Sequence, residues 1–503
     1  MVDYSIVTTI FGEFTPLAPM IVLIIGALVM PAVFFATKRK DVVTIVTLAV
    51  ILISVFFNVL MMATGYPGGG YPEATAYTLF TYDAFAGVVI LLFQTVAFLT
   101  ALVTVSSSET TRMHYGAFNS LLLAAVVGMM FVATANDLIT IFLGVELASI
   151  TSYVLVAMKR SDPRAAEAAV KYVIIGGMST ALTLYGMSML YGATGSTSIA
   201  VIADVLSGQG FTWAFGIAVI TLIAGLGFKV AAVPFHMWAP DVYEGAATPV
   251  SLFLGTGSKK VGFIALFKVF LVMFVVAKAV SSDGMIEVQY IFAIIAAVTM
   301  TVGNVVAIAQ SNIKRMLAYS SIAQAGYILI VMAVATEYSL ASGLFYMFVH
   351  VFMKGGAFLV VGALITVGIG EKISDYQGLF KRAPFIAFAM LLFLFSLAGI
   401  PLTAGFTGKF FLFSSAIYDG GVATQWIWLA FIAILNSAIS LYYYTRVVKA
   451  MFIERGQTTD RIKIPKTFTA AILVCVSFVV ILGVYPQLIM DFCADAASAL
   501  LGG

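Results

Sequence analysis

Charged residues are scarce in this chain. Lys, Arg, Asp and Glu make up 10% of its 503 residues, whereas 62% of the residues are hydrophobic. A soluble domain carries about 25% charged residues, so the composition excludes an ordinary soluble protein. The apolar runs are long enough for membrane-spanning helices rather than barrel strands. The net charge of +3 gives no reason to expect a nucleic-acid partner.

Cysteines are few, and the signatures of soluble enzymes are missing. Cys475 and Cys493 form no CxxC pair, and an iron–sulfur cluster needs several thiolates. The chain contains no GxxxxGK[ST], no dinucleotide fingerprint and no HExxH. The N-terminus lacks the pattern of a signal peptide. We therefore expect no cofactor, no metal and no redox chemistry on this chain itself.

Fourteen apolar stretches are each long enough to span a bilayer, which takes about 20 residues. We expect spans near 16–36, 42–63, 80–105, 115–134, 136–158, 165–191, 213–233, 247–277, 288–309, 315–336, 338–368, 384–415, 423–452 and 467–488. The longest polar gaps are 64–79 and 194–212, so no extramembrane domain fits between the spans. The sequence predicts an all-α integral membrane protein.

Basic residues are unevenly distributed among the loops. Loops after odd-numbered spans hold eighteen, and loops after even-numbered spans hold one, Lys278. Basic loops remain on the cytoplasmic side of a membrane. We therefore expect both termini on the non-cytoplasmic side, most simply of a prokaryotic plasma membrane.

Seven basic residues remain once those assigned to the loops are set aside, and all seven are lysines. They lie within the expected spans: Lys171, Lys229, Lys259, Lys260, Lys268, Lys354 and Lys409. A charge at bilayer depth costs roughly 2.5–3.5 kcal/mol even on lenient insertion scales. A buried lysine can lose its proton, whereas arginine keeps its charge. A row of lysines is therefore suited to accept and release protons.

Two of the lysine-bearing spans also contain helix breakers. Pro234 follows Lys229, and Lys409 follows Pro401 and two glycines in GIPLTAGFTGKFFLF. Proline removes a backbone donor, and broken membrane helices line cavities or ion paths. We predict breaks in the seventh and twelfth helices, the second between about 399 and 408 with its freed backbone groups facing water. The two spans are five positions apart in the order of helices, an odd number, so they run in opposite directions, which suggests inverted repeats.

Glu146 is the clearest buried acid. It lies about ten residues into its span, which places it near the bilayer midplane at 1.5 Å per residue. A carboxylate at that depth needs a cation, and Lys229 or Lys171 would supply it. The charge of that lysine would then depend on its distance from Glu146. Lys171, six residues into its span, could instead reach the cytoplasmic face.

The histidines give a second hint of proton transfer. His350 and Lys354 stand at i and i+4 on one helix face, and histidine titrates near neutrality. This favours a relay over a merely hydrogen-bonded core histidine. His236 follows Lys229 by two turns, with the proline between them.

Some lysines remain ambiguous. Lys259 and Lys260 are adjacent and point to different helix faces; we favour Lys259 for the proton path and leave Lys260 open. Lys268 also stays open. For Lys229 and Lys409, the alternative to a relay is snorkelling to the membrane interface.

Four stretches carry a family resemblance: VPFHMWAPDVYEGAATPV, SNIKRMLAYSSIAQAGY, ANDLITIFLGVE and AGIPLTAGFTGKFFLF. They resemble the antiporter-like membrane subunits of respiratory complex I. The DVYEGA and SLYYYTRVVK stretches are most similar to subunit N. The resemblance is strongest from about 130 to 450. It implies fourteen helices with two inverted five-helix repeats, divided as 1–112 (helices 1–3), 113–278 (repeat one, helices 4–8), 279–453 (repeat two, helices 9–13) and 454–503 (helix 14).

The resemblance also assigns residues. By motif, Glu146 matches the fifth-helix glutamate, and Lys171, Lys229, Lys259 and Lys409 match lysines of the sixth, seventh, eighth and twelfth helices. With the histidines, the candidate relay comprises Glu146, Lys171, Lys229, His236, Lys259, His350, Lys354 and Lys409.

The implied function is proton translocation within a complex I-like oxidoreductase. Such a complex oxidises NADH, ferredoxin or a deazaflavin, reduces quinone or a quinone-like carrier, and contains neighbouring antiporter-like subunits in the lipid bilayer. The His350–Lys354 pair resembles Mrp-type sodium/proton antiporters more than subunit N, so an antiporter subunit is the alternative. A membrane anchor without transport is the third possibility.

Overall fold

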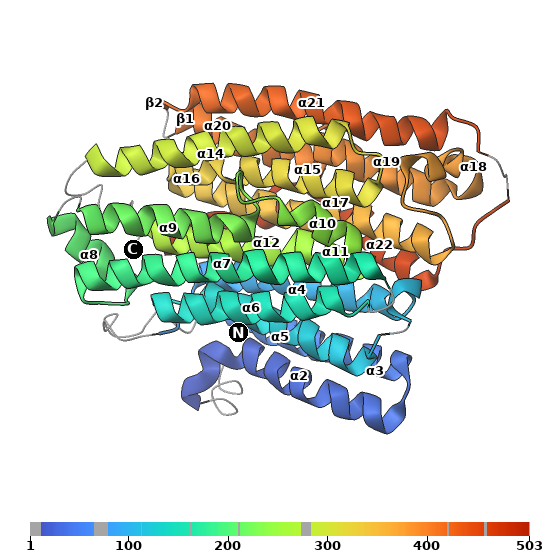
Figure 1. Cartoon of the computed structure of the whole chain (residues 1–503), viewed down its shortest axis with the longest axis horizontal. Coiled ribbons are helices and arrows are strands. Elements are labelled where there is room, and N and C mark those ends of the chain that lie inside the picture. Colours follow the sequence, from blue (N-terminus) through green and yellow to red (C-terminus); the bar gives the residue numbers. More distant parts are fainter. Residues whose placement is uncertain are drawn as a thin grey trace.

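The computed structural model describes residues 12–64, 79–111, 113–159, 162–209, 212–272, 283–419, 422–456 and 460–501. Within these ranges the chain is a bundle of long, roughly parallel helices (Figure 1). Thirteen of them are long and apolar enough to cross a membrane. The described strands are a two-stranded hairpin, β1 (Tyr418–Asp419) and β2 (Val422–Ala423). The predicted all-α membrane fold is confirmed.

The first part of the chain, up to the first helix break, contains η1 (Gly12–Leu17), α2 (Ala18–Thr37), α3 (Lys40–Ala63), α4 (Ala84–Thr104), η2 (Ser108–Thr110), α5 (Tyr115–Thr134), α6 (Leu138–Ala157), α7 (Pro163–Thr194), α8 (Ile199–Gln209) and α9 (Trp213–Val230). The rest contains α10 (Trp238–Gly245), α11 (Thr248–Phe253), η3 (Leu254–Ser258), α12 (Lys259–Leu266), η4 (Phe267–Leu271), α14 (Asp283–Ile308), α15 (Ile313–Ile328), α16 (Ile330–Val334), α17 (Glu337–Thr366), η5 (Ile373–Tyr376), α18 (Leu379–Arg382), α19 (Pro384–Ala398), α20 (Ala404–Ile417), α21 (Ile427–Phe452), α22 (Lys466–Val484) and α23 (Gln487–Leu501).

Among the described helices of more than ten residues, two lie outside the expected spans. α8 occupies the expected polar gap at 194–212, and α23 follows the last expected span. Both are too short to cross a bilayer. α23 packs against α4 and α17, so its stability comes from tertiary contacts that the hydropathy of the chain does not reveal.

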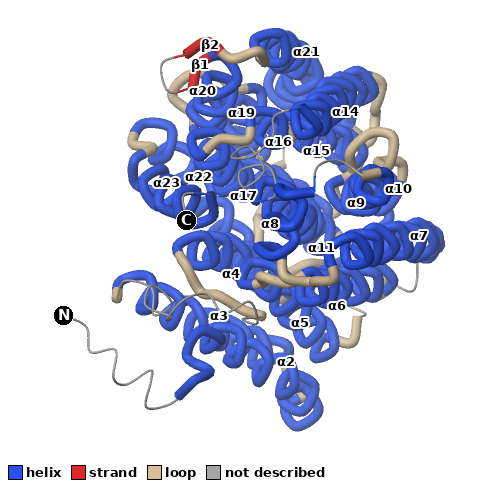
Figure 2. Tube along the Cα trace, turned by 90° about the vertical axis from the view of Figure 1, so that its left-hand side faces the viewer, coloured by secondary structure: helices blue, strands red, loops and turns tan. Residues whose placement is uncertain are grey.

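The middle of the bundle is made by the segment from α11 to η4 and by α15 and α17. In the most apolar 18 residues of each span, all residues of Thr248–Leu271 are buried, as are 94% of those of Ile313–Val334 and of Glu337–Thr366. α2 and α21 lie at opposite ends of the molecule (Figures 1 and 2). The two turns η3 and η4 are π-helical, a form that often occurs at functional sites. They lie beside Lys259 and Lys260 and around Lys268.

The predicted break in the seventh helix is present. α9 ends where Ala231 adopts a left-handed φ of 57°, and the helix resumes as α10. The Trp238 indole N–H donates to the Phe228 carbonyl at 2.9 Å. This contact satisfies a carbonyl at the interrupted helix end and holds α10 against α9.

The predicted break in the twelfth helix is also present. Residues 399–403 separate α19 from α20, within the expected interval, and Gly399 has a φ of 92° that favours glycine. α19 by itself is a shorter apolar helix. The count of fourteen spans and the division at 1–112, 113–278, 279–453 and 454–503 stay predictions.

Substitution of Gly405 by alanine should destabilise this break. A Cβ at Gly405 would lie 1.9 Å from the Ser396 carbonyl oxygen, so the backbones of α19 and α20 would have to separate. Overpacking costs about 1–3 kcal/mol, and we expect a lower melting temperature for the Gly405→Ala protein. Gly177→Ala is the control, because a Cβ at Gly177 meets nothing within 4 Å. Equal melting temperatures for the two variants would contradict this packing.

Candidate functional site

Six of the seven lysines predicted at bilayer depth are buried within the protein. Lys229, Lys259, Lys260, Lys268, Lys354 and Lys409 are each 0–3% exposed. Snorkelling is therefore excluded for Lys229 and Lys409. The seventh, Lys171, has a side chain that is 41% exposed.

Lys229 contacts a serine rather than the predicted glutamate. The Lys229 Nζ donates to Ser149 Oγ at 2.8 Å, and Ser149 lies three residues after Glu146 on α6. The Glu146 Oε1 accepts a hydrogen bond from Thr180 Oγ1 on α7 at 2.7 Å. Among the described residues, Glu146 has no ion pair within 4.0 Å. Lys229 thus reaches α6 one turn from Glu146, and each of the two side chains bonds a hydroxyl.

Lys171 does not supply the cation for Glu146, which leaves Lys229 of the two candidates. The Lys171 Nζ lies 2.7 Å from both Glu167 and Asp241 carboxylates. Glu167 is one turn earlier on α7, and Asp241 is on α10. Lys171 therefore lies at the end of the bundle where α6 finishes and α7 begins, which we call the basic end.

Lys259 and Lys260 are both buried and bind different helices. The Lys259 Nζ donates to Ser321 Oγ on α15 at 3.2 Å, and it lies 5.3 Å from the centre of the Tyr243 ring. The Lys260 Nζ lies 2.8 Å from His350 Nδ1 on α17. The sequence left Lys260 open, but the structure brings it into direct contact with the predicted histidine.

Lys354 extends this cluster toward α21. Its Nζ donates to Ser320 Oγ at 2.7 Å, and the Ser320 hydroxyl is hydrogen-bonded to the Tyr444 hydroxyl on α21. Since Ser320 and Ser321 are adjacent on α15, the same helix turn serves Lys354 and Lys259. The predicted His350–Lys354 pair thus lies beside the Lys259–Lys260 pair.

Lys409 binds the broken end of α19. Its Nζ donates to the carbonyls of Leu397 (2.8 Å) and Ala398 (3.2 Å) and to Ser437 Oγ on α21 (2.9 Å). The same atom lies 4.8 Å from the centre of the Tyr327 ring. The freed carbonyls were expected to face water, and instead Lys409 itself binds them.

A cavity of about 420 Å³ borders Lys409 between α20 and α21. Its lining is mainly apolar, and Phe410 and Ile434 at its edge are exposed at the surface of the chain. Gln324, one turn after Ser320 on α15, also donates to the Leu397 carbonyl, at 3.3 Å. The break therefore connects Lys409 with the helix that serves the central lysines.

His236 and Lys268 lie apart from these contacts. His236 is half-buried in the break after α9, and its Nδ1 has no hydrogen-bond partner among the described residues. The Lys268 Nζ donates to the Ala135 carbonyl at 2.8 Å and lies over the Phe85 ring. Neither side chain has a described bond to the central lysines.

Five of the buried lysines form a row across the bundle, from Lys229 through Lys259, Lys260 and Lys354 to Lys409, which we call the lysine row. Their hydrogen-bond partners are hydroxyl, carbonyl and imidazole groups. None of their described hydrogen bonds is to a carboxylate, so a lysine can release its proton without leaving a buried carboxylate unpaired. The sequence analysis did not identify the serines and the tyrosine that bind these lysines. A hydroxyl in an apolar helix often bonds only the backbone of its own helix, so its presence in the sequence is not informative. Among the described residues, no group of three or more His, Cys, Asp or Glu side chains could hold a metal ion.

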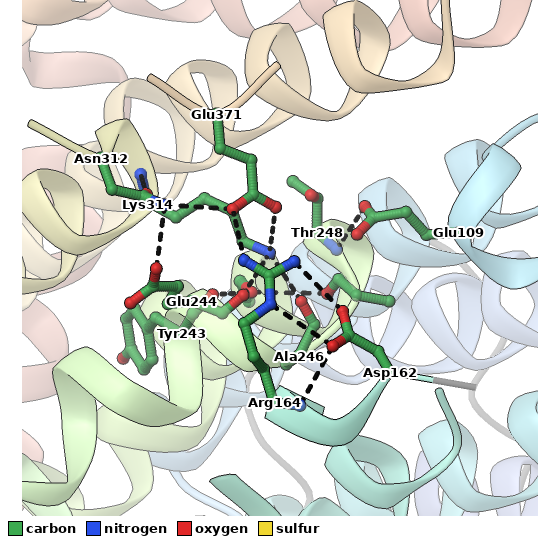
Figure 3. A network of polar contacts seen from close by, with 12 residues as sticks. Glu109, Asp162, Arg164, Tyr243, Glu244, Ala246, Thr248, Asn312, Lys314 and Glu371 are labelled. Carbon is green, nitrogen blue, oxygen red and sulfur yellow. Dashed lines mark hydrogen bonds and ion pairs between the residues drawn. The ribbon is translucent and has the colours of Figure 1, made fainter. Parts of the chain in front are cut away.

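A second polar network lies at the basic end (Figure 3) and was also missed. It joins the loop after α4, the loop between α6 and α7, the turn between α10 and α11, and the loops before α15 and after α17. Burial by itself would raise the pKa of Glu109, but the charges of Lys314 and Lys159 hold this pKa below its ordinary value. The sequence showed these residues only as loop charges that set orientation.

Comparisons with known proteins agree with this arrangement. Residues 135–440 match the family described as NADH:quinone oxidoreductase/Mrp antiporter, TM. The F(420)H(2) dehydrogenase subunit N of Methanosarcina mazei is 42% identical to this chain, and the match covers 97% of the chain and 99% of the relative. The NADH-quinone oxidoreductase subunit N of Bacillus anthracis is 43% identical over 75% of each chain.

Solved structures show the same fold. A chain of the archaeal membrane-bound sulfane sulfur reductase superposes with a TM-score of 0.84 at 25% identity, covering 97% of this chain and 98% of that chain. A chain of respiratory complex I from Thermus thermophilus gives a TM-score of 0.77 at 29% identity, covering 95% and 99%. A chain of the Mrp complex from Dietzia gives 0.83 at 21% identity, covering 97% of each chain, which is a likeness of fold alone.

Proposed function

Because the chain belongs to the NADH:quinone oxidoreductase/Mrp antiporter membrane family, we propose that it translocates protons as subunit N of a complex I-like oxidoreductase. The observation that carries the proposal is the lysine row, which runs from Ser149 on α6 to Ser437 on α21. The row crosses the bundle roughly perpendicular to the helices, along the plane of the membrane. The chain is an integral membrane protein, and the redox chemistry belongs to other subunits.

The residues have different roles in this proposal. Redox events elsewhere change the charge near Glu146, and α6 passes the change to Lys229 through Ser149, one turn away. Lys259, Lys260, His350 and Lys354 pass the proton through the centre of the bundle. Lys409 releases it at the break between α19 and α20.

Two candidates lie outside the row. Lys171 is at the basic end, where its exposed ammonium group and its carboxylate partners would meet protons from the adjoining aqueous phase. His236 lies in the first break, and its unpartnered Nδ1 would bind water on the way to Lys259. We place the basic end on the cytoplasmic side and both termini on the other side.

The host complex is the first thing to test. Inside-out vesicles from cells that contain the assembled complex are supplied with NADH, reduced ferredoxin or a reduced deazaflavin, one at a time. Proton uptake is followed with a pH-sensitive acridine dye. We expect one donor to drive uptake without sodium. Proton uptake that requires a sodium gradient and no electron donor would favour the Mrp-type antiporter, which the His350–Lys354 pair resembles. Full pumping by Lys229→Met would support the anchor without transport.

Lys260 is expected to contribute to translocation, although the sequence favoured its neighbour. Lys260→Met removes the group that contacts His350 at 2.8 Å, and we expect a loss of about threefold to tenfold in proton uptake per electron pair. The control is Lys463→Met, a change of the same type at an exposed position. Equal pumping by both variants would assign Lys260 a purely structural role.

A further inference from the structure

The turn between α10 and α11, residues 244–248, forms a corner at the basic end of the bundle (Figure 3). Four side chains from other parts of the chain bind this corner. We call them the corner clamp: Glu109, Asn312, Lys314 and Arg315. Three of the four come from one stretch, the start of α15 and the residue before it.

The side chain of Lys314 binds backbone groups of the corner. Its fully buried Nζ donates to the carbonyls of Glu244 at 2.8 Å and Ala246 at 2.7 Å. On the other side of the corner, the Glu109 Oε2 accepts from the Thr248 backbone N–H at 2.8 Å. The end of α10 and the start of α11 would otherwise leave these backbone groups unpaired. Lys314 and Glu109 therefore hold both helix ends at once.

The side chains of Arg315 and Asn312 bind a side chain of the corner, the Glu244 carboxylate. The Arg315 Nη1 lies 2.8 Å from Glu244 Oε2 and 2.7 Å from Asp241 Oδ1. The Asn312 Nδ2 donates to Glu244 Oε1 at 3.1 Å. Both oxygens of the Glu244 carboxylate are thus bound from the α15 side. The side chains of Arg315 and Glu244 are 29% and 22% exposed, so this contact lies near the surface.

The clamp reaches the lysine row by two short routes. Glu244 directly follows Tyr243, whose ring lies 5.3 Å from the Lys259 Nζ. Ser321, which accepts from the same Nζ at 3.2 Å, lies seven residues after Lys314 on α15, two turns along the same helix face. The helix α15 therefore carries Ser321, one partner of Lys259, and through the clamp it holds Tyr243, the other partner. An aromatic face and a hydroxyl oxygen both stabilise a protonated amine.

We propose that Lys314 and Arg315 are positioning residues that hold Tyr243 and Ser321 against Lys259 and thereby set how many protons move per electron pair. The inference rests on the proposed function, in which Lys259 carries a proton. Loosening the clamp lets α10 shift relative to α15, and Lys259 then loses the aromatic partner that stabilises its loaded state. Electron transfer in the other subunits continues.

The test measures proton uptake per electron pair by the assembled complex in inside-out vesicles. Arg315→Gln is expected to lower this ratio by about threefold or more, with unchanged amounts of complex and continued electron transfer. Glu244→Gln removes the charge from the other side of the same contact and should also lower the ratio. Arg39→Gln is the matched control, because the Arg39 side chain is 67% exposed and pairs with Asp41 rather than with any residue of the corner clamp.

A double-mutant cycle separates positioning from general stability. Tyr243→Leu should lower the ratio as Arg315→Gln does. The double variant should have a ratio no lower than that of the more impaired single variant. If the losses of the two single variants multiply in the double variant, Arg315 does not act through Tyr243. An equal loss in Arg39→Gln would mean a general charge effect. Either result overturns the inference. If Tyr243→Leu does not assemble, the Arg315–Glu244 pair is used for the cycle instead.

Lys259→Met distinguishes this inference from the proposed function. Normal pumping by Lys259→Met would overturn the proposed relay and the clamp together. Loss of pumping in Lys259→Met, with normal ratios in Arg315→Gln and Glu244→Gln, would overturn the clamp alone.

Discussion

Lys409→Arg is expected to lower proton translocation by about a hundredfold while electron transfer and assembly persist. Arginine keeps the positive charge and can still donate to the Leu397 and Ala398 carbonyls and to Ser437, the three groups that Lys409 binds. It does not release its proton in a protein. The substitution therefore separates a fixed charge at the break from a group that must load and unload.

The measurement is proton uptake per electron pair in vesicles, with the amount of assembled complex as a reference. Lys466→Arg is the matched control, since Lys466 is exposed at the start of α22. Lys409→Met should also lose translocation, because it lacks the amine. Wild-type pumping by Lys409→Arg would show that only a positive charge is needed at this break.

Glu146→Gln is expected to reduce translocation by more than tenfold with little effect on assembly. The glutamine side chain keeps its length, and its amide oxygen can still accept from Thr180 Oγ1, which Glu146 binds at 2.7 Å. Only the charge is lost. Because Ser149 links α6 to Lys229, the proposed signal from Glu146 to the lysine row would be interrupted at its first step.

Three variants decide the role of Glu146. Glu337→Gln, at an exposed site in the first turn of α17, is the control for the charge change. Lys229→Met should assemble and fail to pump, as Glu146→Gln does. If the Glu146→Gln complex disappears from membranes while the Lys229→Met complex persists, Glu146 is structural and the proposed coupling is wrong.

The spans and both helix breaks were predictable because their causes are local. About 20 apolar residues suffice to cross a bilayer, and Pro234 or Pro401 interrupts backbone hydrogen bonding wherever it occurs in a helix. α8 and α23 were missed for the complementary reason. They are too short to span, and α23 is stabilised by packing against α4 and α17, which apolar run length does not encode.

The residues of the candidate site were largely predictable, but their partners were not. Lys229 was a possible partner of Glu146 and bonds Ser149, one turn away on α6. Lys171 was a possible partner of Glu146 and binds Asp241. Lys260 was left open and contacts His350. In each case the partner lies on another helix, and helical periodicity describes only one helix at a time.

The sequence by itself determined that this protein is a helical membrane protein with lysines at bilayer depth, because the cost of burying a charge is high enough to make each such residue informative. The tertiary structure decided which groups those lysines bind and which loop charges form the corner clamp. Glu109, Glu244 and Lys314 are far apart in the chain and meet only when α10, α11 and α15 pack together. Such contacts depend on how each helix is rotated and how deep it lies in the bundle. Side-chain packing between helices sets both, and the hydropathy pattern along the sequence does not contain them.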